Sequence, residues 1–173
     1  MHAQAFFKVV TMDESDLLEQ LTALFAEHHI AYCVIGGQGV NAYVEPLVSL
    51  DLDVVVVSEQ LTEVERLLAE SFSVKHFPHS LNVATPHSDL RVQIQTDARY
   101  ADFPARASVR EVLGRPLRVA ALEDVLQGKI WAALDPERRG SKRQKDLADI
   151  ARLIEAYPPL RERVPAEILN WLV

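Results

Sequence analysis

The stretch that decides the fold is Val34–Val56, VIGGQGVNAYVEPLVSLDLDVVV. A glycine pair, Gly36 and Gly37, ends one apolar run, and two aspartates, Asp51 and Asp53, stand at the start of the next. Short apolar runs bounded by glycine are typical of buried strands. The segment therefore predicts two strands joined through a glycine turn and a short helix, with carboxylates at the mouth of the second strand.

The two aspartates are expected to lie side by side. Residues i and i+2 of a strand point to the same face, so Leu52 and Val54 turn into the core while Asp51 and Asp53 face away from it. Carboxylates this close repel each other unless a cation lies between them. Mg²⁺ takes one or two carboxylates and completes its shell with water and phosphate oxygens, so the pair predicts a metal-phosphate site. The alternative is structural: aspartates that cap a strand or pair with nearby Lys and Arg.

The composition indicates one globular domain in the cytoplasm. The chain has 173 residues, of which 49% are hydrophobic, enough for a single core. Its longest apolar runs fall far short of the ~20 residues that cross a bilayer, and its N-terminus lacks the basic start of a signal peptide. We therefore expect a soluble protein with no membrane contact. The single cysteine, Cys33, excludes an internal disulfide and indicates a reducing compartment.

The net charge of −7 argues against a protein that coats nucleic acid, because such proteins neutralise many phosphates with Lys and Arg. One local exception is the basic segment Arg138–Lys145, RRGSKRQK. It is either a contact for a polyanion or protein acceptor or a solvated helix entrance.

The remaining pattern mixes helices and strands irregularly. Helical periodicity marks residues 11–30, with Thr11 and Glu14 in capping-box spacing, and residues 61–68, 122–133 and 147–154. Ser58 is the expected N-cap of the second helix. Strand patterns mark residues 31–35 and 50–57, residues 73–97 as antiparallel strands broken at 77–79 and 86–88, and residues 116–120 as a short edge strand. The order predicts an α+β fold: a mixed sheet flanked by helices, with a helical C-terminal part. We expect one domain over 1–173, made of an N-terminal helix region (1–30), a sheet core (31–119) and a helical part (120–173).

The segment that begins with the glycine pair resembles the nucleotidyltransferase superfamily, of the DNA polymerase beta-like fold. Its pattern is a glycine pair after a strand and then a Thr/Ser-x-Asp-x-Asp strand, matched here by Gly36, Gly37, Ser49, Asp51 and Asp53. The later sequence LRVAALEDVLQGKIWAAL…RRGSKRQKDLADIARLI is similar to bacterial members of the AbiEii-type and MNT-like kind. Their helix lysine and R…K..D..D helix are matched by Lys129, Arg138 or Arg139, Lys145, Asp146 and Asp149.

The resemblance implies transfer of a nucleoside monophosphate from an NTP to an acceptor hydroxyl, with release of pyrophosphate. Asp51 and Asp53 would hold Mg²⁺ or Mn²⁺, the metal cofactor. Gly36, Gly37 and Ser49 would help to bind the nucleotide, and Lys129 and Lys145 would hold its phosphates. The same resemblance has Asp149 orient Lys145 or Lys129; the alternative is that Asp146 and Asp149 form a solvated ladder of ion pairs.

Two positions depart from the family pattern. The third carboxylate of catalytic members corresponds to Gln93, which has no charge and cannot act as a base. An arginine two residues before the Thr/Ser is replaced by Leu47. Three functions therefore stay open: a working transferase on a small-molecule, RNA or protein hydroxyl; a member that binds Mg-NTP without transfer, as a regulatory or toxin–antitoxin component; and a non-enzymatic interaction protein. The apolar C-terminus, PAEILNWLV, is a candidate contact for a partner protein or a second copy.

Overall fold

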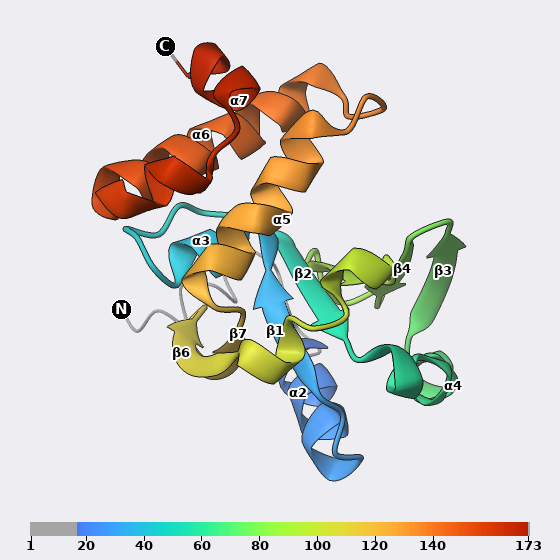
Figure 1. Ribbon diagram of the computed structural model, residues 1–173. Helices are drawn as coiled ribbons and strands as arrows, with labels where there is room; N and C mark the ends of the chain where they lie inside the picture. The colour runs from blue at the N-terminus through green and yellow to red at the C-terminus, as the bar shows by residue number, and fades with distance from the viewer. Residues whose placement is uncertain (1–16, 173) are drawn as a thin grey trace.

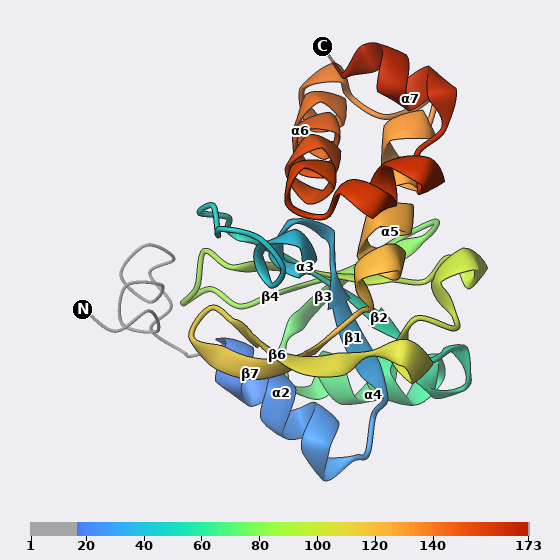
Figure 2. The same cartoon turned by 60° about the vertical axis from the view of Figure 1, so that its left-hand side comes forward.

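The structure, a computed structural model, describes residues 17–172. A seven-stranded mixed sheet separates two layers of helices, with α2 and α4 on one side and α5, α6 and α7 on the other (Figures 1 and 2). The strands are β1 (Tyr32–Ile35), β2 (Asp51–Val56), β3 (Ser73–Phe77), β4 (Ser80–Ala84), β5 (Arg91–Gln95), β6 (Ser108–Val112) and β7 (Arg115–Val119). The α-helices are α2 (Leu17–Glu27), α3 (Gly36–Asn41), α4 (Leu61–Ser71), α5 (Leu122–Leu134), α6 (Gly140–Ala156) and α7 (Ala166–Trp171). The 3₁₀ helices are η1 (Ser58–Gln60), η2 (Ala98–Tyr100), η3 (Pro104–Arg106) and η4 (Pro158–Arg163). This arrangement confirms the predicted mixed sheet flanked by helices.

Strand β2, which carries the two aspartates, lies in the middle of the sheet. The strand order is β3-β4-β5-β2-β1-β7-β6, in which β2 is antiparallel to β1 and parallel to β5. The prediction of an edge strand over 116–120 was wrong, because β7 lies between β1 and β6. The hairpin that turns at Leu113 and Gly114, both with positive φ, places β6 outside β7. The hairpin therefore supplies the outer strand, and β7 becomes internal to the sheet.

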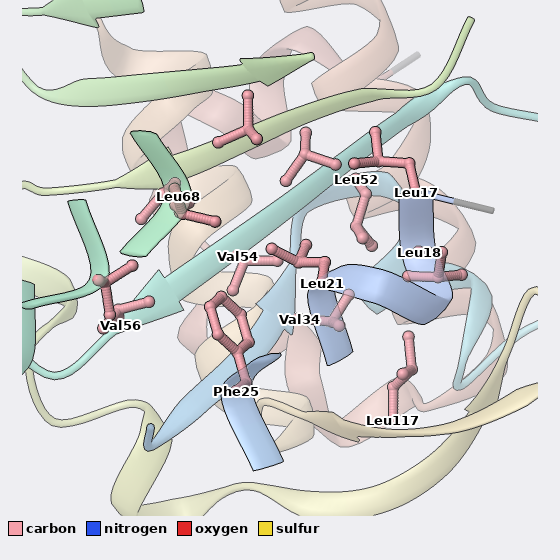
Figure 3. Close-up of a cluster of buried hydrophobic side chains, with 14 of the residues drawn as sticks. Leu17, Leu18, Leu21, Phe25, Val34, Leu52, Val54, Val56, Leu68 and Leu117 are labelled. Carbon is pink, nitrogen blue, oxygen red and sulfur yellow. The ribbon is translucent and has the colours of Figure 1, made fainter. Parts of the chain in front are cut away.

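The first layer buries the face of the sheet to which Leu52 and Val54 point. Helix α2 lays its apolar stripe, including Leu21 and Phe25, against β1 and β2, as the close-up in Figure 3 shows. Leu52 and Val54 are each 1% exposed, as the alternation of β2 predicted. Burial of a side chain of this size stabilises the fold by about 1.5–3 kcal/mol, so this face is fixed and the aspartates are held on the other.

The second layer covers the opposite face beyond the aspartates. Val55 on β2 and Cys33 on β1 pack there with Leu126 of α5 and Ile150 of α6. Burial raises the pKa of the Cys33 thiol to about 12, so the thiol stays protonated and inert. This layer therefore lies on the same face of β2 as Asp51 and Asp53, where a ligand of these aspartates would meet it.

The expected N-cap Ser58 was also wrong. Ser58 opens the short helix η1, and α4 begins only at Leu61, with no side-chain cap bond from its N-cap Gln60. A 3₁₀ turn occupies the connection instead, as is common before a helix. The capping box at Thr11 and Glu14 lies outside the described residues.

Candidate active site

The two aspartates project from one face of β2. Asp51 is exposed and pairs with Arg91 of the neighbouring strand, with Nε 2.7 Å from Oδ1. Asp53 is partly buried below it. The pair with Arg91 shows that the structural alternative holds in part for Asp51, although an ion pair this exposed stabilises a protein by about 0–1 kcal/mol. It leaves Asp53 to be explained by other neighbours.

Gly36 lies against the carboxylate of Asp53. Its φ is +65°, and a Cβ at this position would overlap the Oδ2 of Asp53. A larger residue would therefore be strained twice, by its backbone and by the aspartate. At Gly37, by contrast, no atom of residues 17–172 outside its chain neighbours and the backbone of α3 lies within 4 Å of the place where a Cβ would stand. The glycine pair combines close approach to Asp53 with open space beside it, room that a phosphate group can use.

The surroundings of Asp53 set its charge. Burial raises the pKa of Asp53 most, Asp51 adds to the rise, and Lys129, Arg138 and Lys142 oppose it; together they bring the pKa to about 6. At neutral pH the carboxylate is mostly ionised but costs free energy to keep so. A divalent cation would remove that cost, which is why the position suits a metal ligand.

Lys129 of α5 forms ion pairs with two aspartates of α6. Its Nζ lies 3.0 Å from Oδ1 of Asp146 and 2.8 Å from Oδ2 of Asp149, and the residue is 8% exposed. Burial would lower the pKa of Lys129, but the two carboxylates outweigh burial and raise it. The lysine is therefore a fixed cation near Asp53, and the prediction that Asp149 orients it agrees with this contact.

Asp146 is not part of a solvated ladder. It is 1% exposed and also accepts a hydrogen bond from Nε of Arg138 at 2.8 Å. A buried carboxylate with two cationic donors is costly to remove, because Arg138 would lose its ion pair and Lys129 would keep only Asp149. Asp146 thus joins α5, α6 and the turn between them into one rigid unit.

The exposed lysines of α6 differ in direction. Residues four and seven apart share a face of a helix, so Lys142 lies on the stripe of Asp146 and Asp149 that meets Lys129. Lys145 comes one residue before Asp146, about 100° round the helix from it, and is exposed. Lys142 is also among the charges that act on Asp53. The structure therefore places Lys142 on the side of α6 that faces the site. The family motif does not include Lys142, although its spacing of four residues from Asp146 predicts that the two share a helix face.

Gln93 lies beside Asp53 on the neighbouring strand. The parallel pairing of β2 and β5 sets Asp53 opposite Gln93, and β4 sets Asn82 opposite Gln93 on its other side. Gln93 is exposed. Next to the aspartates the sheet therefore presents amides, where the family pattern has a carboxylate.

Ser49 acts on the start of β2. Its Oγ accepts a hydrogen bond from the backbone N–H of Asp51 at 3.2 Å, and its carbonyl accepts one from Gln38 at 3.2 Å. Gln38 is 2% exposed, and its Oε1 accepts a bond from Asn41. Gln38 and Asn41 fix the chain that leads into the aspartates, and no pattern in the sequence singled them out.

Part of the basic segment Arg138–Lys145 is internal. Arg138 binds Asp146, and Arg143 donates to the carbonyl oxygens of Ala133 and Asp135 at 3.0 and 2.8 Å. Arg139, Lys142 and Lys145 remain exposed. The expectation of a solvated helix entrance agrees with these three exposed cations, whereas Arg138 and Arg143 brace α5 against α6. A contact with a polyanion or protein acceptor stays a prediction.

The donor set fits Mg²⁺ or Mn²⁺. Among residues 17–172, no group of three or more His, Cys, Asp and Glu side chains is placed to hold an ion. Two carboxylates on one strand face match the way Mg²⁺ binds through one or two carboxylates and takes its other ligands from water and phosphate. The two aspartates would supply an incomplete shell for such an ion, and phosphate oxygens of a triphosphate are the kind of ligand that could complete it.

No helix in the described part of the chain is long and apolar enough to cross a membrane.

Comparison with known structures places this architecture among nucleotidyltransferases. ANT(2")-Ia in complex with adenylyl-2"-tobramycin superposes with a TM-score of 0.57 and 15% identity, over 85% of this chain and 96% of that one. The lincosamide adenylyltransferase LnuA, bound to lincomycin, gives 0.53 and 13%, over 79% and 95%. A candidate nucleotidyltransferase from Thermotoga maritima gives 0.51 and 16%, over 77% and 91%. At these identities the likeness shows the fold alone.

Sequence comparison supplies the family. No curated protein matches the chain. The family model described as the nucleotidyl transferase AbiEii toxin of type IV toxin–antitoxin systems matches residues 45–171, well over half of the sequence. The matched part contains β2 with its aspartates, Lys129 of α5 and the acidic stripe of α6. The chain therefore belongs to the AbiEii nucleotidyltransferase family.

Proposed function

We propose that this protein transfers a nucleoside monophosphate from an NTP to an acceptor hydroxyl, with Asp51 and Asp53 as ligands of Mg²⁺ or Mn²⁺. The observation that carries the proposal is the environment of Asp53. Its carboxylate faces Gly36, and Lys129, Arg138 and Lys142 lie close enough to act on its charge. An anionic ligand entering this space would meet amides and cations around a metal-binding carboxylate.

The residues of the chain would divide the work as follows. Gly36 and Gly37 leave room for phosphate oxygens to approach the backbone. Lys142 supplies an exposed positive charge, and Arg138 supplies one that is held in place by Asp146. Lys129 keeps the interior of the site cationic. The metal, when bound, would neutralise charge on the phosphate oxygens. Much of the catalytic effect in phosphoryl transfer comes from positioning and electrostatics of this kind.

In the proposed reaction, the acceptor oxygen forms a bond to the α-phosphorus as the bond to the β-phosphate oxygen breaks. Pyrophosphate leaves, and the hydroxyl proton passes to solvent, because Gln93 cannot take it. In a loose transition state little proton transfer to a general base is needed. The amide of Gln93 is therefore expected to lower the rate without abolishing transfer.

Gln93 also favours a second candidate. A member that binds Mg-NTP but does not transfer would act by binding alone, as a regulatory or toxin–antitoxin component. Its partners would be a nucleoside triphosphate and a protein, and a cytoplasmic location remains a prediction for either candidate.

The experiment that separates the candidates follows label from each α-labelled NTP. The protein is incubated with Mg²⁺ or Mn²⁺ and with RNA, protein and small-molecule fractions of a lysate, and Asp51→Ala serves as the control. Label that depends on Asp51 identifies both the activity and the acceptor class. Mg-NTP binding without any labelled product favours the second candidate.

A further inference from the structure

The segment of residues 45–48, which precedes Ser49 and β2, is held by polar contacts and not by packing. All four of its residues are exposed, with Leu47 59% and Val48 71% exposed. Burial of apolar surface therefore does little to order it. This segment, here called the entry loop, nevertheless sets the position of the chain as it enters Asp51.

Asn41, at the end of α3, grips the entry loop through one residue. Its Nδ2 donates to the carbonyl oxygen of Leu47 at 2.7 Å, and its Oδ1 accepts from the N–H of Leu47 at 3.0 Å. Both main-chain groups of Leu47 are thus paired with one side chain. An amide that satisfies a donor and an acceptor of one residue fixes its orientation as well as its position.

Arg152 of α6 completes the grip from the other side. Its Nη2 donates to the carbonyl oxygen of Glu45 and, at 3.3 Å, to Oδ1 of Asn41. Its Nη1 donates to Oδ1 of Asp149 at 2.8 Å. The side chain of Arg152 is 21% exposed, so these bonds are only partly screened by water. One planar fork joins α6, α3 and the entry loop.

The same carboxylate connects this fork to the interior of the site. Oδ2 of Asp149 binds Lys129 while Oδ1 binds Arg152. A continuous chain of contacts therefore runs from Lys129 through Asp149 and Arg152 to the entry loop. Ser49 follows the entry loop directly in the sequence, and its hydroxyl accepts a hydrogen bond from the N–H of Asp51.

We infer that Arg152 is a positioning residue that holds the entry loop, and through it Asp51, in the geometry required to bind the metal–nucleotide complex. The inference rests on the proposed function, and it adds a residue outside the metal and phosphate ligands. Residues that support metal ligands from behind typically change metal affinity about 10–100-fold when they are replaced.

The chain offers a matched control in Arg143. It lies on the same helix and donates to two carbonyl oxygens, those of Ala133 and Asp135, away from the entry loop. Arg152→Lys keeps a cation beside Asp149 but cannot reach all three acceptors at once, since an ammonium lacks the planar fork. Arg143→Lys makes the same chemical change without touching the loop.

Two measurements on the full chain test the inference. Hydrogen exchange of amides 45–51 is expected to be at least about 10-fold faster in Arg152→Lys and unchanged within about 2-fold in Arg143→Lys. The electron paramagnetic resonance signal of Mn²⁺, with each α,β-methylene NTP, is expected to show about 10-fold weaker Mn²⁺ binding in Arg152→Lys only. The affinity for nucleotide without metal should not change in Arg152→Lys. This serves as a control, because a general loss of structure would lower that affinity as well.

Loop exchange at the wild-type rate in Arg152→Lys, or equal acceleration in Arg143→Lys, overturns the inference. So does unchanged Mn²⁺ affinity in a variant whose loop exchanges faster. A wild-type protein that binds no Mn²⁺–nucleotide overturns the proposed function and the metal-positioning role together, while the exchange ratio still reports whether Arg152 holds the loop. If the lysine variant is poorly folded, Asn41→Ser removes the loop contacts from the side of α3 and is expected to give the same two changes.

Discussion

Replacing Asp53 with asparagine is expected to stabilise the metal-free protein at neutral pH. Burial holds the pKa of Asp53 at about 6, against 3.8 for a free aspartate. The native state therefore binds this proton more tightly than the unfolded state does. The resulting stability is present at low pH and is lost as pH rises through 6, so above that pH ionised Asp53 opposes folding. Asparagine has nearly the same shape and carries no such charge.

The magnitude follows from the two pKa values. At about 1.4 kcal/mol per unit, the shift of Asp53 from 3.8 to about 6 corresponds to a cost of about 3 kcal/mol at pH 7.5 and about 1 kcal/mol at pH 4.5. Asp53 is only partly buried, so the first figure is an upper value. For a chain of this length each kcal/mol raises the melting temperature by about 2–4 °C. Asp53→Asn is thus expected to melt roughly 3–10 °C higher at pH 7.5.

The assay is thermal and urea unfolding of both proteins in EDTA at pH 7.5 and pH 4.5, and again with Mn²⁺ and NTP. Ligand at 100 times its Kd stabilises the protein that binds it by about 2.7 kcal/mol, so saturating Mn²⁺–NTP should close the gap by stabilising the wild type alone. Asp51→Asn is the matched control. It loses an exposed ion pair, and we expect its stability to stay within about 1 kcal/mol of the wild type at both pH values.

Two results would refute this reasoning. One is an Asp53→Asn variant less stable than the wild type by more than about 1 kcal/mol at pH 7.5, which would mean that ionised Asp53 stabilises the fold through its cationic neighbours. The other is a stability difference that does not change between the two pH values, which would mean that the pKa of Asp53 is not raised.

Four further substitutions test the surroundings of Asp53. Lys142→Ala is expected to weaken NTP binding about 10-fold, since a charge-assisted hydrogen bond contributes about 1.5–3 kcal/mol. Lys145→Ala is expected to change NTP binding less than about 2-fold. Equal effects of the two substitutions in a binding titration would contradict the conclusion that Lys142, and not Lys145, faces the site. Gln93→Asp is expected to raise the transfer rate at least about 10-fold by supplying a proton acceptor, and a single-turnover rate no higher than that of the wild type would argue against this position as the site of the missing carboxylate. Gly36→Ala is expected to cost about 1–3 kcal/mol of stability, measured by urea unfolding, because the new Cβ meets a carboxylate at positive φ; a variant as stable as the wild type would show that this packing is loose.

Local patterns were enough to predict the centre of the fold. The alternation of Leu52 and Val54 with the aspartates decided which face of β2 is buried, because a shift of one residue would expose both apolar side chains. The same alternation in β5 placed Gln93 on the outer face, and the structure pairs it with Asp53. These features depend on spacing within one strand, which a sequence displays directly.

Features that depend on contacts between distant elements could not be predicted from the sequence. The clamp formed by Arg152 joins residues more than 100 positions apart, and no local rule connects an arginine of α6 to a carbonyl of the entry loop. Lys142 is an intermediate case. Its spacing predicts that it shares a helix face with Asp146 and Asp149, but only the contacts of these aspartates with Lys129 show that this face points toward the site. The position of β7 likewise depended on which hairpin formed beside it.

The most direct test of the central claim is transfer of label from α-labelled NTP by the wild-type protein and by Asp53→Asn, with Mg²⁺ or Mn²⁺ and fractionated acceptors. Asp53→Asn is the sharpest comparison because it is expected to be at least as stable as the wild type at neutral pH, so loss of activity cannot come from unfolding. If Asp53 is a metal ligand, the wild type is expected to form labelled product and the variant none. Equal labelling by both proteins would contradict the assignment of Asp53 as a metal ligand.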